Sequence, residues 1–434
     1  GENMQVLYHK LNELYKDGKF INVAVVGAGF MGSSLISQLN LINGFKCNIC
    51  YSRNNEKTKD VYLKIGVSEP KIKYIDSPTE YDNSSDNFYI MNDLYNFFGL
   101  KDIDVFVDAT GDPYEGAKIA FEAIKHGKHI VSLNVECDVV VGSLLAEKAR
   151  EKNVTYTGIA GDEPGTVKEL YDFAKLLGFE VLAIGKGKNN PLDYEANYET
   201  VEKEANEKGI RPYMLASFVD GSKTMEELTL MCNATGFKPD VPGCHGIVSD
   251  IKNLDKNLKL KSEGGVLDSY NVCEYVMGIA PGVFVLVKAP NDFIDHEMRF
   301  LKVGDGPNYV LYRPFHLTSI EVPVTILQAY FFNLPTICPI PLKPVADTVA
   351  IAKRDLKPGD LLDGPGGKTI YGKIMTYSSS REMNYMPYGL ASENVKVVRE
   401  IKKGEPIKYD DVEIENSKLF ELRKELELLT KSLK

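Results

Sequence analysis

Two lysines separated by one residue, Lys186 and Lys188, are well suited by type and spacing to chemistry. They follow an apolar stretch predicted as a strand, Val181 to Gly185, and side chains two apart in extended backbone point to the same side. Two neighbouring ammonium groups lower each other's pKa, which suits proton transfer near neutral pH. Hydride transfer to a carbonyl needs such a proton donor for the developing alkoxide. An ordinary basic loop is the alternative interpretation.

Four more charged side chains form two candidate pairs. Asp220 and Lys223 flank a turn, and Arg313 and His316 lie three residues apart in a mostly apolar neighbourhood. A buried charge is costly unless it meets a partner or an anionic ligand. We therefore weigh Arg313 and His316 equally as a substrate site and as a structural pair.

Two carboxylates, Asp162 and Glu163, directly precede a predicted helix that reaches Leu177. Asp162 suits the N-cap position of that helix. Glu163 is then available to a substrate or a metal ion.

A glycine turn near the N-terminus carries the spacing of a dinucleotide site. The predicted strand Ile21 to Val26 precedes it and a predicted helix, Ser33 to Leu41, follows. The three glycines permit a tight turn, close approach of a pyrophosphate, and helix–strand packing, in that order. The expected cofactor-binding residues of this turn are Gly27, Ala28, Gly29, Phe30, Met31 and Gly32.

The end of the second strand favours NADP(H) over NAD(H). An NAD site has an acidic residue here to accept the ribose hydroxyls, whereas this chain has Ser52 and Arg53. A guanidinium can pair with the 2′-phosphate of NADP, although Arg53 could also simply face solvent. Thr110 and Gly111, which end a later strand, complete the expected cofactor site.

Strands alternate with helices in the N-terminal part, which predicts an α/β fold with a doubly wound parallel sheet of the Rossmann type. The segment from 54 to 100 is an insertion to which the sequence assigns no role. We expect a Rossmann domain at 1–158 and an α+β substrate and oligomerisation domain at 159–339. A small β-rich domain at 340–415 and a C-terminal helix at 416–434 follow, and the helix's leucine seam suits docking on its own domain or a subunit contact equally.

Composition narrows the function classes. The formal net charge of -10 argues against a nucleic-acid partner, and no apolar run is long enough to span a bilayer. Without a signal peptide, we expect a cytoplasmic protein. Seven scattered cysteines, including Cys47 and Cys50 within one predicted strand, favour reduced thiols.

Several motifs together resemble the homoserine-dehydrogenase-like oxidoreductases with a C-terminal SAF domain. The motifs are Val23–Gly32, Asp108–Gly111, Asn134–Glu136, Gly161–Gly165, Gly185–Lys188, Phe218–Thr224 and Leu311–Thr318, and the SAF-like part comprises Ala352–Leu361, Val398–Ile407 and Asp410–Val412. One branch of that family is the reductoisomerase that reduces and rearranges deoxyxylulose phosphate with NADPH and a divalent metal. The resemblance therefore implies Mg²⁺ or Mn²⁺ as a cofactor of this chain.

The resemblance implies that a group of polar residues would line such a site. The expected catalytic residues are Lys186, Lys188, Asp220, Lys223 and Glu163, and the expected substrate contacts are Asn134, Glu136, Asp162, Arg313 and His316. We expect a homo-oligomer that acts on a small-molecule substrate.

Three functions follow as hypotheses. The first is NADPH-dependent reduction of a small phosphorylated hydroxy-aldehyde or hydroxy-ketone, with the reductoisomerase reaction as its sharpest version. The second is a homoserine dehydrogenase, although Leu133-Asn134-Val135 stands where that enzyme has Ala-Asn-Lys. The third is a nucleotide- or sugar-binding regulator without turnover.

Overall fold

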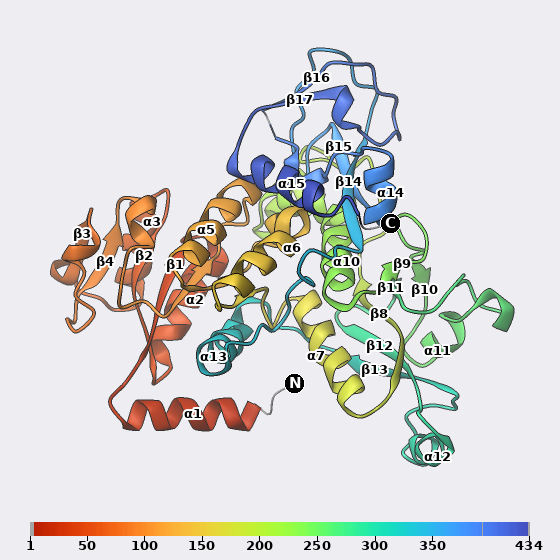
Figure 1. Cartoon of the computed structure of the whole chain (residues 1–434), viewed down its shortest axis with the longest axis horizontal. Helices are drawn as coiled ribbons and strands as arrows, with labels where there is room; N and C mark the ends of the chain where they lie inside the picture. The colour runs from red at the N-terminus through yellow and green to blue at the C-terminus, as the bar shows by residue number, and fades with distance from the viewer. Residues whose placement is uncertain (1–3, 393, 433–434) are drawn as a thin grey trace. The chain divides into compact units, whose positions relative to one another are not determined.

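The computed structural model describes residues 4–392 and 394–432 (Figure 1). It divides into two compact units that are each discontinuous in sequence. The first unit comprises Gly1–Cys137, Leu144–Gly165 and Leu317–Cys338, and the second comprises Asp138–Ser143, Thr166–His316 and Pro339–Lys434. The contiguous domain boundaries expected from the sequence stay a prediction.

The first unit is built on a seven-stranded parallel sheet, as the sequence predicts. Its order is β3-β4-β2-β1-β5-β6-β7. The strands are β1 (Ile21–Val26), β2 (Phe45–Tyr51), β3 (Ile72–Ile75), β4 (Phe88–Met91), β5 (Val105–Asp108), β6 (His129–Ser132) and β7 (Tyr156–Thr157). The helices of this part are α1 (Met4–Lys16), α2 (Phe30–Leu41), α3 (Asn55–Lys64), α4 (Leu94–Phe97), α5 (Pro113–Lys125), α6 (Val135–Glu151) and α13 (Val322–Phe332).

The inserted segment has a structural role that the sequence did not reveal. It supplies α3, β3 and β4, and the two strands extend the sheet beyond β2. Strands β1 and β5 are apolar runs without polar alternation, because a parallel sheet with helices on both faces buries both sides of each strand. Val23 and Val25 of β1 are fully buried.

The second unit contains a mixed sheet of order β10-β11-β8-β12-β13, with β9 pairing with β11. Its strands are β8 (Glu180–Lys188), β9 (Lys238–Pro239), β10 (Ile247–Val248), β11 (Val272–Met277), β12 (Val283–Lys288) and β13 (Asn308–Arg313). The helices are α8 (Glu202–Lys208), α9 (Pro212–Val219), α10 (Ser222–Thr235), α11 (Leu254–Asn257) and α12 (Asp292–Phe300), and α7 (Glu163–Leu176) enters this unit from the first. Strand β8 is longer than predicted and includes both lysines.

The C-terminal part of this unit, residues 339–434, is called the C-terminal module below. It contains two antiparallel pairs, β14 (Ala346–Ala352) with β15 (Ile370–Thr376) and β16 (Val395–Val397) with β17 (Val412–Ile414). Helices α14 (Tyr377–Glu382) and α15 (Lys418–Leu429) complete it.

Helix α10 is enclosed by its neighbours. It contacts β8 and β11 of the mixed sheet and β14 and β15 of the C-terminal module. Nearly all of its residues are buried, including the charged Glu226 and Glu227. A helix buried all round needs internal partners for its polar groups.

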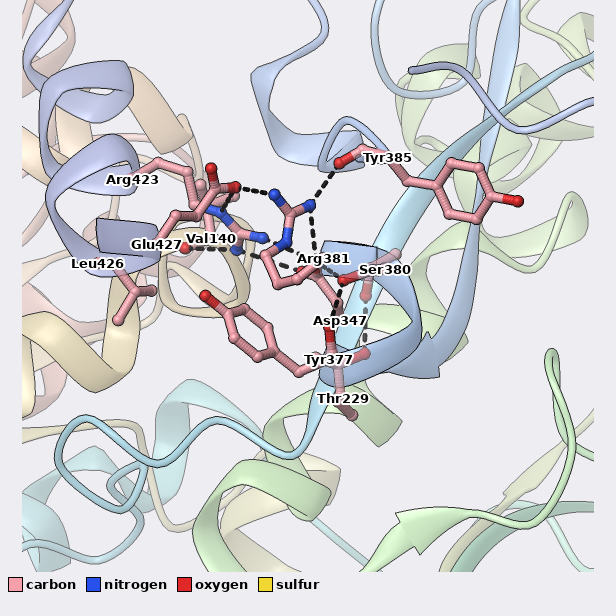
Figure 2. Close-up of polar contacts among 12 residues, drawn as sticks. Val140, Thr229, Asp347, Tyr377, Ser380, Arg381, Tyr385, Arg423, Leu426 and Glu427 are labelled. Atoms are coloured by element: carbon pink, nitrogen blue, oxygen red, sulfur yellow. Dashed lines mark hydrogen bonds and ion pairs between the residues drawn. The ribbon is translucent and has the colours of Figure 1, made fainter. Parts of the chain in front are cut away.

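The final helix docks on its own chain (Figure 2). Leu419, Leu422 and Leu426 are buried, whereas Leu429 is half exposed. Arg423 lies 2.7 Å from Asp347 of β14, and it also donates to the carbonyl of Val140, which belongs to the same unit. The apolar seam therefore packs internally.

All seven cysteines are free thiols, and Cys47 and Cys50 are both buried in β2. Among the described residues, no helix is long and apolar enough to cross a membrane.

Replacing Arg423 tests how firmly the final helix is anchored. Arg423→Met leaves the buried Asp347 carboxylate without its closest cation, so we expect the free energy of unfolding to fall by about 3 kcal/mol. Lys261→Met, which breaks an exposed pair with Asp268, is the control and should change it little. Equal denaturation midpoints for the two variants would contradict this account.

Candidate functional site

The glycine turn of the first unit has the geometry of a phosphate cradle. A Cβ on Gly32 would lie 2.2 Å from the carbonyl oxygen of Gly27. Gly27 has φ +105°, and a Cβ there would lie 3.0 Å from the carbonyl oxygen of Ala109. A Cβ on Gly29 would meet nothing within 4 Å, which leaves room for a ligand against the backbone.

Helix α2 begins with amides suited to an anion. Its N-cap residue is Gly29, and no side chain caps it. The first N–H groups of a helix have no partner within the helix, so they can bind a diphosphate. Phe30 is 92% exposed and Met31 is partly exposed at this turn, while Ala28 is buried. The residues present therefore fit a dinucleotide.

The neighbouring strand ends form a hydrogen-bonded network. Thr110 donates its backbone N–H and its hydroxyl to the Asp108 carboxylate, and Gly111 follows with a positive φ. The Asn134 amide donates to Asp108 and to the Asp112 carbonyl, and its oxygen caps α6. Burial raises the pKa of Asp108 to about 6. Asn134 has a scaffolding role here, and its predicted contact with substrate stays a prediction.

Arg53 lies in an acidic environment. Its guanidinium is 3.1 Å from Glu115 and 3.6 Å from Asp112, and its side chain is 70% exposed. The Ser52 hydroxyl donates to the Asn54 carbonyl and contacts Thr58. Arg53 is thus paired rather than simply solvent-facing.

In the second unit, strand register places three cations on one face of the mixed sheet. Val283 of β12 lies opposite both Lys186 of β8 and Arg313 of β13. Directly opposite residues share a face and adjacent strands are about 5 Å apart, so Lys186 and Arg313 are separated by about 10 Å. Lys188, two residues along β8, points to the same face.

The two β8 lysines are buried but have different partners. The Lys186 ammonium donates to both carboxylate oxygens of Glu227, at 3.1 and 3.2 Å. Lys188 donates to the Phe218 carbonyl, at 2.7 Å. Burial, followed by repulsion from Lys186, lowers the pKa of Lys188 to about 8. Lys188 can therefore exchange a proton near neutral pH.

Asp220 is fully buried at the end of α9. Lys353 donates to it at 2.8 Å, and the backbone N–H of Ser222 donates to its other oxygen. Burial raises the pKa of Asp220, against the effect of Lys353. Lys223 lies in the first turn of α10.

At the end of β13, Arg313 lies 3.7 Å from Glu169 of α7 and stacks over Phe315 at 4.5 Å. His316 is half buried. Arg313 therefore has a carboxylate and an aromatic ring as partners within the unit. The pairing of Arg313 with His316, and the contact of either with substrate, stay predictions.

The remaining predicted residues lie at helix starts. Glu136 is in the first turn of α6, and Asp162 directly precedes Glu163, the first residue of α7. Within either unit taken alone, the described residues gather no set of three metal-ligating side chains. The ligands of the expected Mg²⁺ or Mn²⁺ therefore stay a prediction.

Sequence reasoning missed Glu227 and Lys353, which neutralise Lys186 and Asp220. Glu227 and Lys353 lie 41 and 133 residues from their respective partners in the sequence, so no local pattern predicts these pairs. The only available signal was that charged residues in an apolar helix or strand need partners.

Comparison with known proteins finds one family whose model matches the middle of the chain. Residues 161–322 match the family described as the catalytic domain of oxidoreductase DRL. No curated protein matches the chain. The family match confirms the enzyme class predicted from the sequence, an oxidoreductase.

Solved structures resemble the chain only distantly. A DOX-P reductoisomerase in complex with magnesium has 13% identity and a TM-score of 0.43, over 73% of this chain and 71% of that chain. A probable dehydrogenase from Thermotoga maritima has 11% identity and a TM-score of 0.38, over 70% and 85%. A levoglucosan dehydrogenase in complex with NADH and L-sorbose has 17% identity and a TM-score of 0.28, over 41% and 47%. These likenesses carry no functional argument.

Adding one methyl group tests the glycine turn. In Gly32→Ala the new Cβ collides with the Gly27 carbonyl oxygen, so the turn must shift away from its cradle geometry. We expect calorimetry to show at least a tenfold loss of dinucleotide affinity. Gly99→Ala, where the new Cβ would meet no atom closer than 3.4 Å and the backbone φ is not positive, is the control for folding and should bind normally. Unchanged affinity in Gly32→Ala would exclude this turn as the cofactor site.

Proposed function

We propose that this oxidoreductase reduces the carbonyl group of a small, phosphorylated hydroxy-aldehyde or hydroxy-ketone with NADPH. The observation that carries the proposal is the pair of buried lysines on one face of β8, with Arg313 on the same face. A guanidinium binds phosphate in a bidentate manner, and ammonium groups stabilise a developing alkoxide.

Each cation has a separate task. The proposed proton donor is Lys188, because its pKa near 8 leaves it protonated at neutral pH and able to release the proton. Lys186 polarises the carbonyl oxygen, and Glu227 keeps that ammonium charged. Bound NADPH supplies the hydride to the carbonyl carbon. The Lys188 proton then passes to the oxygen, which gives the alcohol. Lys223 and Glu163 stay catalytic candidates.

The preference for NADP(H) rests on Arg53. In the absence of a 2′-phosphate, Asp112 and Glu115 neutralise its guanidinium. We propose that the phosphate displaces these contacts, because a guanidinium forms stronger bidentate pairs with phosphate than with single carboxylate oxygens.

The sharpest version of the proposal is reductive isomerisation of deoxyxylulose phosphate with Mg²⁺ or Mn²⁺. It is supported by the sequence resemblance alone. NADPH oxidation followed with deoxyxylulose phosphate, aspartate semialdehyde and sugar-derived aldehydes, with and without each metal ion, distinguishes it from a homoserine dehydrogenase. Tight NADPH binding without any turnover would favour the regulator.

Reversing the charge of Arg53 tests the cofactor preference. Arg53→Asp places a carboxylate where NAD sites accept the ribose hydroxyls, so we expect the ratio of NADPH to NADH turnover to fall at least tenfold. Lys118→Asp, which alters another cation near Glu115, is the control and should leave the ratio unchanged. An unchanged ratio in Arg53→Asp would refute the assignment.

The pH dependence of turnover tests Lys188. A proton donor is active in its protonated form, so the rate of reduction should fall as pH rises through about 8. In Lys188→Met the fall in rate near pH 8 should disappear. Its kcat should be at least tenfold lower, with cofactor affinity nearly unchanged. Lys238→Met, at a lysine on the exposed end of β9, should keep the wild-type profile. A matching loss of cofactor binding in Lys188→Met would mean that the lysine contacts cofactor phosphate instead.

A further inference from the structure

The C-terminal module inserts one charged side chain into the turn between α9 and α10. Lys353 directly follows β14, and its side chain is 3% exposed. Its ammonium donates to the Asp220 carboxylate at 2.8 Å, to the Ala196 carbonyl at 2.6 Å and to the Gly367 carbonyl at 2.8 Å. An ammonium has three N–H donors, so this one is fully satisfied.

Asp220 links Lys353 to the backbone of the turn. One of its oxygens accepts from Lys353 and the other from the Ser222 N–H at the start of α10. Gly221, between them, has φ +83°, a conformation that suits glycine. The carboxylate therefore fixes the geometry of the turn, and Lys353 fixes the carboxylate.

The same turn also positions the hydrogen-bond acceptor of Lys188. Phe218 lies two residues before Asp220, in the last turn of α9, and its carbonyl also accepts from the backbone N–H of Gly221 in the turn at 3.4 Å. Its carbonyl accepts from Lys188 at 2.7 Å. A continuous path of short contacts thus runs from Lys353 through the turn to Lys188.

Two further contacts from the same module hold the first half of α10. The backbone N–H of Gly372 in β15 donates to the Ser222 hydroxyl at 2.8 Å. The hydroxyls of Thr348 in β14 and Thr229 in α10 lie 2.7 Å apart. Both contacts are buried, so α10 and the glutamate that pairs with Lys186 are located by the module.

We propose that Lys353 is a positioning residue for Lys188, and that the C-terminal module thereby forms part of the catalytic apparatus. This inference rests on the proposed function, in which Lys188 transfers the proton. Lys353 itself acts through Asp220 and the turn, because its three donors are all occupied.

The charges that act on Lys188 give the expected sign of a pH effect. Lys186 on β8 disfavours its ammonium form, whereas Glu227 on α10 and Asp220 in the turn favour it. Lys353 is the main group that keeps Asp220 ionised against the effect of burial. Without Lys353, the pKa of Asp220 rises further, so its carboxylate form and its support for the Lys188 ammonium are less favoured. The pKa of Lys188 should therefore fall.

The test compares Lys353→Met with Asp220→Asn and with a matched control in the full-length protein. Asp220→Asn removes the Asp220 charge and Lys353→Met makes that charge less favourable, so each should lower the alkaline pKa of the kcat profile measurably. Both should also reduce kcat about tenfold with little change in cofactor affinity. The double variant should be no worse than either single one, because the two residues act as one unit. Lys353→Arg, which keeps a cation, should recover part of the loss.

Arg423→Met is the control, because it breaks another buried ion pair of the same module without touching the turn (Figure 2). It should lower the melting temperature but leave the pH profile unchanged. If Lys353→Met and Arg423→Met lose stability alike and both keep the wild-type profile, Lys353 is merely structural and the inference is overturned.

An NMR titration makes the test independent of turnover. In protein labelled with ¹³C at lysine Cε, the signal that disappears in Lys188→Met reports the Lys188 pKa directly. This pKa should fall in Lys353→Met and Asp220→Asn even if no substrate is turned over. A shift with an inactive wild type would contradict the proposed function alone, and an unshifted signal would contradict the positioning role alone. If Lys353→Met does not fold, Asp220→Asn and Lys353→Arg decide the question.

Discussion

The structure of the second unit depends on the burial of two ammonium groups whose partners come from α9 and α10. Lys186 and Lys188 lie on β8, which has strands on both sides. Removing a charge from water costs several kcal/mol unless close partners replace the water. Glu227 supplies one partner, and the Phe218 carbonyl supplies the other. The mixed sheet can therefore accept α9 and α10 only in a position that brings both acceptors to the lysines.

Local features of the molecule could be predicted from the sequence, because their causes lie within a few residues. The strand before the glycine turn was predicted with its observed bounds, Ile21–Val26, and α2 begins at Phe30, three residues earlier than expected. The glycine spacing alone does not show that Phe30 and Met31 already belong to the helix. The insertion at 54–100 was not interpreted, since β3 and β4 are short and are recognisable only by their pairing with the rest of the sheet.

The environment of a polar side chain was harder to predict than its position. Asn134 lies at the end of a parallel strand, where ligands often bind. Its side-chain amide nevertheless donates to Asp108 and Asp112, and its oxygen accepts from the start of α6. Arg53 is also at the expected position, but no local pattern predicts that two acidic side chains of the α5 region pair with it. Apart from the local cap of α6, these partners come from the end of β5 and the start of α5, which only the folded structure brings close to Asn134 and Arg53.

The chemistry of the lysine pair depends on an imbalance between its partners. If both lysines faced carboxylates, each ammonium would be stabilised and neither would release a proton near neutral pH. If neither did, mutual repulsion and burial would discharge one or both. The structure gives a carboxylate to Lys186 and a neutral carbonyl to Lys188, so the first retains its charge and its field acts on the second. In the proposed reaction, this asymmetry gives the electrostatic task and the proton transfer to different residues of one strand, although the two side chains are chemically identical.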